Sequence, residues 1–133
     1  MHQMIRCRCA TQAANFNLTM SLGHELAHSG ITVNTISPGP IVTTTSETVW
    51  LEVAKTRGWD GDLKGVERRL CQDVLYSPTD RLGRVEDVAN LVAFVASPVA
   101  DFINGTNHRV DGGFTAAMTH LSRQSTLDQS RAG

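Results

Sequence analysis

The sequence contains few aromatic residues, few cysteines and no cluster of charge. Aromatic residues make up 5% of the 133 residues, charged residues make up 19%, and the formal net charge is −1. Binding to nucleic acid or to an anionic membrane surface requires clustered lysine and arginine, so we expect neither as a partner. No apolar run reaches the length of a membrane span, and the opening stretch MHQMIRCRCA lacks the apolar segment of a secretory signal.

The cysteines are too few and too irregular for a disulfide framework. Cys7, Cys9 and Cys71 form an odd set, so free thiols in a cytoplasmic protein are the simplest interpretation. Cys7 and Cys9 have no second pair of Cys or His residues at zinc-finger spacing, and we expect no metal site there. The hydrophobic fraction is 41%, which suits one globular domain of this length.

Hydrophobic periodicity and turn residues predict helices that alternate with strands. Leu18, Leu22 and Leu26 recur every four residues, as on one face of a helix, and Gly30 is a suitable end for that helix. The β-branched run ITVNTIS then predicts a strand, which Pro38 stops because proline has no N–H for the ladder. The expected elements are a helix at 11–28, a strand at 31–37, helices at 45–58, 63–76 and 84–97, and a strand at 106–110.

This order indicates an α/β fold with two parallel strands and flanking helices. Strands connected through helices are normally parallel, with a right-handed crossover. Two parallel strands make a poor sheet by themselves, because buried parallel strands need covered faces and neighbours at both edges. We therefore expect part of a larger sheet.

The helices predicted at 45–76 form an insertion between regular elements, where segments that cover a substrate often lie. We expect Thr45 or Ser46 to cap the first of them. Trp50 and Trp59 flank the insertion and are candidates for an apolar substrate slot, although core packing is the commoner role for such residues.

Three stretches of the sequence resemble one protein family. NLTMSLGHELAHSGITVNTISPGPIVT, DRLGRVEDVANLVAFVASPVADFINGT and RVDGG look like the C-terminal half of short-chain dehydrogenases/reductases, and most like the 3-oxoacyl reductase-like group. The resemblance covers residues 10–114; residues 1–9 fall outside it, and we expect residues 115–133 to be a tail, frayed or disordered at its end. It implies a partial Rossmann-like doubly wound fold, of which this chain would be the C-terminal portion.

The resemblance also implies an oxidoreductase that uses NAD or NADP and acts on a carbonyl/alcohol pair. Pro38 and Gly39 would form a turn beside the nicotinamide ring, where a side chain at Gly39 would crowd the ring or the turn. The backbone of Ile41 and the hydroxyl of Thr43 would hydrogen-bond the nicotinamide carboxamide. Neither the substrate nor the choice between NAD and NADP follows from these residues.

The family's catalytic residues are missing from the positions where the resemblance predicts them. In the family, a helix begins with a tyrosine that exchanges a proton with the substrate, and a lysine four residues later lowers the pKa of that tyrosine. Arg8 and Gln12 occupy these positions, and Tyr76, the only tyrosine, lies far along the chain. Arginine stays charged, glutamine carries no charge, and no glycine-rich phosphate motif occurs. We expect no activity from this chain alone.

A second reading is a non-catalytic module that associates with itself or docks onto a full-length relative. Family members associate through the helix that matches 11–28 and through the helix and strand that match 85–110. His108 is then expected at a surface or an interface, and Arg81 is expected to contact either the chain's own carbonyls or a neighbouring subunit. Asp111 is expected to form a turn rather than to act as an acid.

A third reading is a zinc metalloprotease. The stretch HELAH matches H-E-x-x-H, in which two histidines one helical turn apart bind zinc and the glutamate acts as the base. His24, His28 and Glu25 would fill these roles. No third ligand stands at the extended-motif spacing, and Glu47 and Glu52 are the remaining candidates. The motif is short, and chance matches to it are common, so we expect no metal site.

Overall fold

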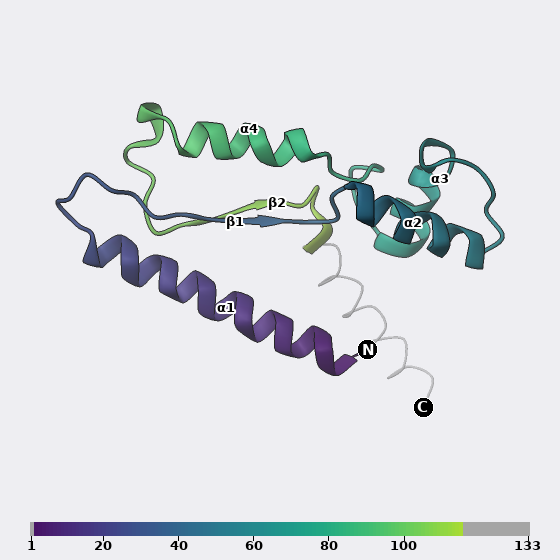
Figure 1. Cartoon of the computed structure of the whole chain (residues 1–133), viewed down its shortest axis with the longest axis horizontal. Coiled ribbons are helices and arrows are strands. Elements are labelled where there is room, and N and C mark those ends of the chain that lie inside the picture. The colour runs from purple at the N-terminus through teal and green to yellow at the C-terminus, as the bar shows by residue number, and fades with distance from the viewer. Residues whose placement is uncertain (1, 116–133) are drawn as a thin grey trace, which may run out of the picture. The chain divides into compact units, whose positions relative to one another are not determined.

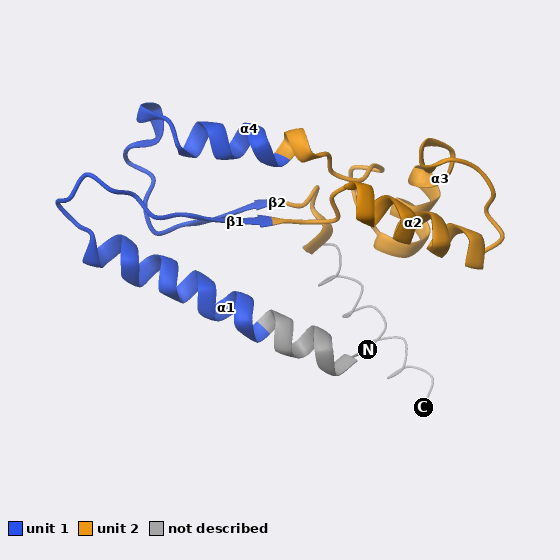
Figure 2. Cartoon of the chain, viewed as in Figure 1, with its two compact units in different colours: residues 1–37, 88–109 blue, residues 38–87, 110–133 orange. Residues whose placement is uncertain are grey.

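The computed structural model describes residues 2–115, and side chains from residue 10 onward. The helices and strands follow the predicted order (Figure 1). They are α1 (His2–Glu25), β1 (Thr35–Pro38), α2 (Thr44–Thr56), α3 (Leu63–Leu70), a π-helical turn (Cys71–Leu75), α4 (Val85–Val95), a 3-10 turn (Pro98–Ala100) and β2 (Asn107–Val110). The described residues fall into two compact units. The first unit contains residues 2–37 and 88–109, and the second contains residues 38–87 and 110–115 (Figure 2). The tail expected at 115–133 lies outside the described residues after Thr115.

Strands β1 and β2 form a two-stranded parallel sheet. In the first unit Thr35 N–H donates to Thr106 C=O at 2.9 Å, and in the second unit Gly39 N–H donates to Val110 C=O at 2.9 Å. Both strands advance by the same number of residues between these two bonds, so they run in the same direction, as predicted.

The Asn104 side chain contributes to two element boundaries that the sequence pattern placed wrongly. Its Oδ1 accepts the Val33 N–H at 2.8 Å, so Val33 pairs with a turn, and β1 begins at Thr35 rather than at the start of the β-branched run. Its Nδ2 donates to Gly23 C=O at 3.0 Å, just before α1 ends at Glu25. These contacts join segments that are distant in the sequence, so local periodicity does not reveal them.

Helix α1 differs from the predicted helix at both ends. It begins at His2 rather than at Thr11, and it ends at Glu25 rather than at His28. The chain then turns, and His28 at φ 68° and Gly30 at φ 77° both adopt left-handed conformations. Gly30 therefore lies in the turn as expected, but the helix has already ended.

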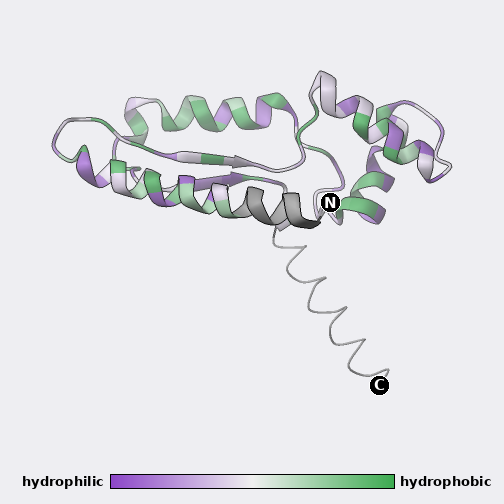
Figure 3. Ribbon diagram, turned by 60° about the horizontal axis from the view of Figure 1, so that its bottom comes forward, coloured by the Kyte–Doolittle hydropathy of each residue, from purple (hydrophilic) through white to green (hydrophobic). Residues whose placement is uncertain are grey.

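In the first unit, α1 and α4 lie on opposite faces of the strand pair (Figures 1 and 3). Helix α4 has the predicted apolar periodicity, yet none of its residues is buried. Val92 on α4 is 47% exposed, and Leu18 on α1 is 55% exposed. A two-stranded sheet is too narrow to cover both helices. This arrangement confirms the prediction of a partial α/β fold.

The second unit contains the tightest core, within the insertion that looked least regular in the sequence. Apolar residues of α3 share one face, and Asp62 caps the helix by accepting the Gly65 N–H at 2.9 Å. The buried members of this core are Ala54, Leu63, Val66, Leu70, Cys71, Leu75 and Leu82. Trp50 and Trp59 pack against it, which is the commoner of the two roles considered for them.

Leu70→Ala is expected to destabilise the second unit by about 2–5 kcal/mol, because Leu70 is fully buried and its truncation leaves a cavity. Urea unfolding followed by tryptophan fluorescence measures this loss, since both tryptophans pack against the core. Val49→Ala on α2, with a side chain that is 50% exposed, is the control and should change the free energy of unfolding by less than about 1 kcal/mol. Equal losses in the two variants would contradict this core.

Candidate functional site

The predicted site residues lie together in residues 38–43, at the carboxyl end of β1; we call this segment the β1 turn. Pro40 C=O accepts the Gly83 N–H at 2.9 Å, and Val42 N–H donates to Gly83 C=O at 2.8 Å. These two bonds make an isolated parallel bridge between Ile41 and Gly83. The β1 turn is therefore held in place by the backbone of a segment far along the chain.

The bridge orients the polar groups of Ile41. In a parallel pairing, a residue whose two neighbours bond to the partner directs its own N–H and C=O to the opposite side. Ile41 C=O accepts the Ser46 hydroxyl at 2.8 Å, and none of the described residues accepts the Ile41 N–H. The β1 turn thus presents one backbone donor that the described part of the chain leaves available for a ligand acceptor.

Thr43 is the N-cap of helix α2, and its hydroxyl forms the capping hydrogen bond. Its Oγ1 accepts the Ser46 N–H at 3.2 Å, and Ser46 Oγ accepts the Thr43 N–H at 2.7 Å. This reciprocal pair is a capping box. The prediction that Thr45 or Ser46 would be the N-cap is therefore wrong: Thr43 is the cap, and Ser46 is its partner in the first turn.

Gly39 is required by the close approach of the two strand ends. A Cβ on Gly39 would lie 2.7 Å from both Cα and Cβ of Asp111, closer than side chains pack. Asp111 in turn accepts the Gly113 N–H at 3.0 Å and the Thr115 N–H at 3.2 Å. The expectation that Asp111 forms a turn is confirmed. Crowding in the turn, one of the two reasons expected for Gly39, comes from the residue that follows β2.

The two glycines after Asp111 pack against the segment that ends the insertion. Gly112 and Gly113 have φ of 58° and 83°. A Cβ on Gly112 would lie 2.6 Å from Thr79 Oγ1, and one on Gly113 would lie 3.1 Å from Pro78 Cγ. The DGG stretch therefore does more than stop a strand, because it lets the end of β2 approach the insertion within the second unit.

Two carboxylates from neighbouring helices hold the segment 81–84. Asp87 accepts the Arg81 guanidinium at 2.7 and 2.9 Å and the Arg84 N–H at 2.7 Å. Glu67 on α3 accepts the Leu82 N–H at 2.8 Å and pairs with the Arg84 guanidinium at 2.7 Å. Arg81 also donates to Leu82 C=O at 3.0 Å. Contact with the chain's own carbonyl, one of the two roles expected for Arg81, is thus present.

These contacts keep both carboxylates ionised at neutral pH. Hydrogen bonds from the Arg81 side chain and the Arg84 backbone lower the pKa of Asp87 to about 2. Burial would raise the pKa of Glu67, but hydrogen bonds from Arg84 and Leu82 outweigh it, and the pKa is lowered. In contrast, burial raises the pKa of Cys71 to about 11, so this thiol stays protonated and is unsuited to nucleophilic chemistry.

The zinc hypothesis needs His24 and His28 on one helical face, and the structure removes this premise. Helix α1 ends at Glu25, and His28 lies in the following turn with φ 68°. Among the described residues, no group of three His, Cys, Asp or Glu side chains is arranged to hold a metal ion. The candidates for a third ligand, Glu47 and Glu52, are both exposed on α2.

The other candidates lie apart from the β1 turn in the sequence. Arg8 and Gln12 fall on α1; the Arg8 side chain is outside the described set, and Gln12 is exposed. Tyr76 follows the π-helical turn at φ 52° and is 47% exposed. His108 Nε2 lies 2.5 Å from Thr106 Oγ1.

In the described part of the chain, no helix combines the length and hydropathy needed to cross a bilayer.

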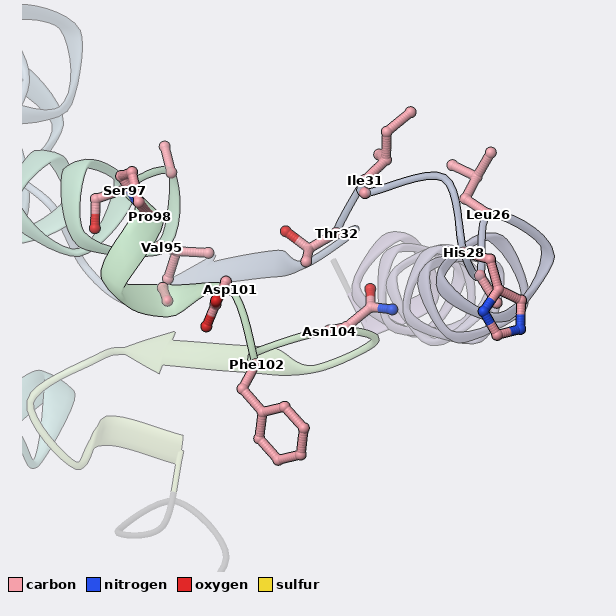
Figure 4. A pocket seen from close by; sticks show the side chains of 14 residues that line it. Leu26, His28, Ile31, Thr32, Val95, Ser97, Pro98, Asp101, Phe102 and Asn104 are labelled. Atoms are coloured by element: carbon pink, nitrogen blue, oxygen red, sulfur yellow. The ribbon is translucent and has the colours of Figure 1, made fainter.

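A groove of about 860 Å³ lies in the first unit (Figure 4). Its lining comes from 26–32, before β1, and from 95–104, before β2. The groove is therefore at the amino ends of the strands, whereas ligands of open α/β sheets bind at the carboxyl ends. No lysine or arginine lines it, and His28 is the basic residue of its lining.

Sequence reasoning missed two residues of the site, Gly83 and Glu67, and named Ser46 only as a possible N-cap. Ser46 stands three residues after Thr43, which is the spacing of a capping box, so a local signal for its role as capping partner exists. Gly83 and Glu67 act through partners that are distant in the sequence, and no local pattern marks them. Only the folded chain identifies these two.

Known proteins similar to this chain are oxidoreductases by name. A sequence profile described as enoyl-(acyl carrier protein) reductase matches residues 4–115. The chain is 37% identical over 102 residues to isoepoxydon dehydrogenase patN of Penicillium expansum, a match that covers 77% of the chain and 35% of that protein. It is 38% identical over 106 residues to sorbitol dehydrogenase of Cereibacter sphaeroides, covering 79% and 39%. It is 37% identical over 105 residues to 3-oxoacyl-[acyl-carrier-protein] reductase FabG of Haemophilus influenzae, covering 79% and 37%.

Solved structures of a short chain dehydrogenase family protein and of a reductase also superimpose on this chain. A short chain dehydrogenase family protein from Francisella tularensis superimposes with a TM-score of 0.66 at 27% identity, covering 80% of this chain and 42% of that one. L-sorbose reductase from Gluconobacter frateurii, complexed with NADPH and L-sorbose, superimposes with a TM-score of 0.66 at 31% identity, covering 79% and 38%. The chain thus spans 35–39% of the length of the three curated relatives named above.

Proposed function

The chain belongs to the short-chain dehydrogenase/reductase family of oxidoreductases, and we propose that it forms the nicotinamide side of an NAD(P)-dependent site acting on a carbonyl/alcohol pair. We propose further that the chain is catalytically inactive by itself. The observation that carries the proposal is the Ile41 N–H, which the bridge to Gly83 directs outward and which no described residue accepts. The carboxamide oxygen of nicotinamide is a matching acceptor.

The names of the relatives support the reaction class and go no further. They include a sorbitol dehydrogenase and a 3-oxoacyl-[acyl-carrier-protein] reductase. One solved relative is a reductase complexed with NADPH and L-sorbose. Because these substrates differ, the proposal for this chain stops at a carbonyl/alcohol pair and at NAD or NADP.

The residues of the β1 turn fit a nicotinamide ring. A bound nicotinamide supplies the hydride chemistry, and the protein has to hold the ring. In this proposal the ring lies against Pro38 and Gly39, the Ile41 N–H donates to the carboxamide, and the Thr43 hydroxyl forms a second hydrogen bond to it. The backbone donor is fixed before the ligand arrives, so binding requires little reorganisation.

The chain's own residues do not complete a catalytic site. Arg8 and Gln12 stand where the family has its tyrosine and lysine, and an arginine side chain cannot exchange a proton at physiological pH. The sequence contains no glycine-rich phosphate motif. Both the proton relay and the phosphate contacts must therefore come from other polypeptide, and this is the reason for proposing inactivity.

The purified chain is expected to show no saturable binding of NADPH or NADH tighter than about 1 mM, and no NADPH oxidation with a generic ketone. Isothermal titration calorimetry and NADPH absorbance measure these two properties. FabG of Haemophilus influenzae, assayed under the same conditions, is the positive control. Saturable heat or ketone-dependent loss of NADPH with the purified chain would contradict the proposed inactivity.

A chimera tests the β1 turn itself. Residues 13–115 of this chain are joined behind the N-terminal portion of FabG, so that the tyrosine, lysine and phosphate motif expected in the family come from the relative. Thr43→Val is expected to raise the KM for NADPH about tenfold, since one hydrogen bond to the carboxamide is lost, whereas Thr43→Ser keeps the hydroxyl and should change KM little.

Thr43 also caps α2, so the chimera needs a stability control. Asp62→Ala removes the N-cap of α3, where Asp62 accepts the Gly65 N–H at 2.9 Å, and leaves the β1 turn and the Thr43 hydroxyl intact. It should lower stability as much as Thr43→Val does, with a smaller change in KM. An unchanged KM in Thr43→Val would show that the hydroxyl does not contact the cofactor.

A second candidate function, which we also propose for test, is a non-catalytic module that associates with itself or docks onto a full-length relative. Leu18 on α1 and Val92 on α4 are about half exposed, and Phe102 is fully exposed. Association would remove this apolar surface from water. Light scattering after size exclusion is expected to give dimers or larger species, and a monodisperse monomer would count against this candidate.

A further inference from the structure

The Glu67 carboxylate on α3 makes two kinds of contact with the segment 81–84. Its Oε1 accepts the Leu82 N–H at 2.8 Å. The Arg84 guanidinium pairs with it through Nη1 to Oε1 at 2.7 Å and Nη2 to Oε2 at 2.9 Å. The Glu67 side chain is only 13% exposed, and Leu82 is buried in the core. One carboxylate thus fixes the residues on both sides of Gly83.

Gly83 carries this constraint to the β1 turn. Its N–H donates to Pro40 C=O at 2.9 Å, and its C=O accepts the Val42 N–H at 2.8 Å. A Cβ on Gly83 would collide with the end of the Ile41 side chain and would lie 3.4 Å from Pro40 O, so the segment around Gly83 packs directly against the β1 turn. The position of Gly83 therefore decides where the Ile41 N–H points.

We propose that Glu67 is a positioning residue for the nicotinamide contact: it holds Leu82 and Arg84, thereby fixes Gly83, and through Gly83 sets the backbone of Ile41. This inference rests on the proposed function of the β1 turn. Glu67 itself touches neither cofactor nor substrate. Its lowered pKa, noted above, means that the carboxylate is ionised at neutral pH and available for both contacts.

A neighbouring ion pair, between Arg68 on α3 and Asp80 in a later turn, provides a matched control. Arg68 and Asp80 approach to 3.3 Å with side chains that are 74% and 42% exposed, a setting in which ion pairs contribute little. Asp80 has φ 54°, which asparagine tolerates. Asp80→Asn therefore makes the same carboxylate-to-amide change as Glu67→Gln, in the same unit, at a carboxylate whose partners are Arg68 and Gln72 rather than Leu82 and Arg84.

The first test uses the full chain and measures amide hydrogen exchange by NMR. In Glu67→Gln, exchange of the Val42 and Gly83 amides is expected to rise about tenfold, the factor that corresponds to about 1.4 kcal/mol. Glu67→Met also removes the acceptor for Leu82 N–H, and a larger rise is expected. The amides of Val66 and Leu70 in α3 should change less, and Asp80→Asn should leave Val42 and Gly83 unchanged.

The second test uses the chimera and separates positioning from loss of folded protein. If Glu67→Gln only unfolded part of the sample, the apparent kcat would fall and the KM for NADPH would stay the same. Positioning predicts instead that the KM for NADPH rises, about three- to tenfold on the scale of a weakened hydrogen bond. Asp80→Asn should change neither constant.

The two tests distinguish failure of the inference from failure of the proposed function. Equal exchange of Val42 and Gly83 in Glu67→Gln, Glu67→Met and the parent chain would overturn the positioning role, whatever the kinetics show. Faster exchange with an unchanged KM in both Glu67→Gln and Thr43→Val would support the positioning of the β1 turn and refute its contact with nicotinamide. Faster exchange together with a raised KM is the expected result.

Discussion

Backbone pairing at the carboxyl end of β1 is the constraint on which the candidate site depends. Gly39 bonds to Val110 on one side, and Pro40 and Val42 bond to Gly83 on the other. Such pairing tolerates no side chain at Gly39, where a Cβ would enter Asp111. Because the turn is fixed by backbone on both sides, the Ile41 N–H, which no described residue accepts, has a defined direction. A flat ring bound there would meet a surface that is already formed.

The two units differ in how much of their own apolar surface they bury. The second unit closes a core around α3, with Leu70 and Cys71 fully buried. The first unit places α1 and α4 on a sheet of two strands and leaves α4 without a buried residue. In a doubly wound fold, further strands would supply the missing cover. The described residues accordingly contain a well-packed insertion and an ordered turn, but the sheet among them has two strands, β1 and β2.

The sequence predicted most of the elements, because helix periodicity and β-branched runs are local properties. The order of helices and strands, the parallel sheet and the turn at Asp111 were predicted correctly. The errors concern element boundaries near which a residue distant in the sequence forms hydrogen bonds. The predicted continuation of α1 to His28 was wrong, because the helix ends at Glu25. The Asn104 side chain bonds to Gly23 C=O just before that end and to Val33 N–H ahead of β1. The zinc interpretation of HELAH required His24 and His28 on one helical face, so it loses its geometric basis as well. Thr43 as the cap of α2 was within reach of local reasoning and was overlooked.

For the site, the resemblance of the sequence to the family was enough to single out Pro38, Gly39, Ile41 and Thr43 as expected cofactor contacts, and to predict that Arg8 and Gln12 stand at the positions of the family's catalytic pair. Residue identity carries that information, because chemistry such as proton exchange belongs to the side chain. The direction of the Ile41 N–H and the roles of Gly83 and Glu67 emerged only from the folded chain. Hydrogen bonds between segments far apart in sequence leave no periodic trace, and only three-dimensional packing brings their donors and acceptors within reach.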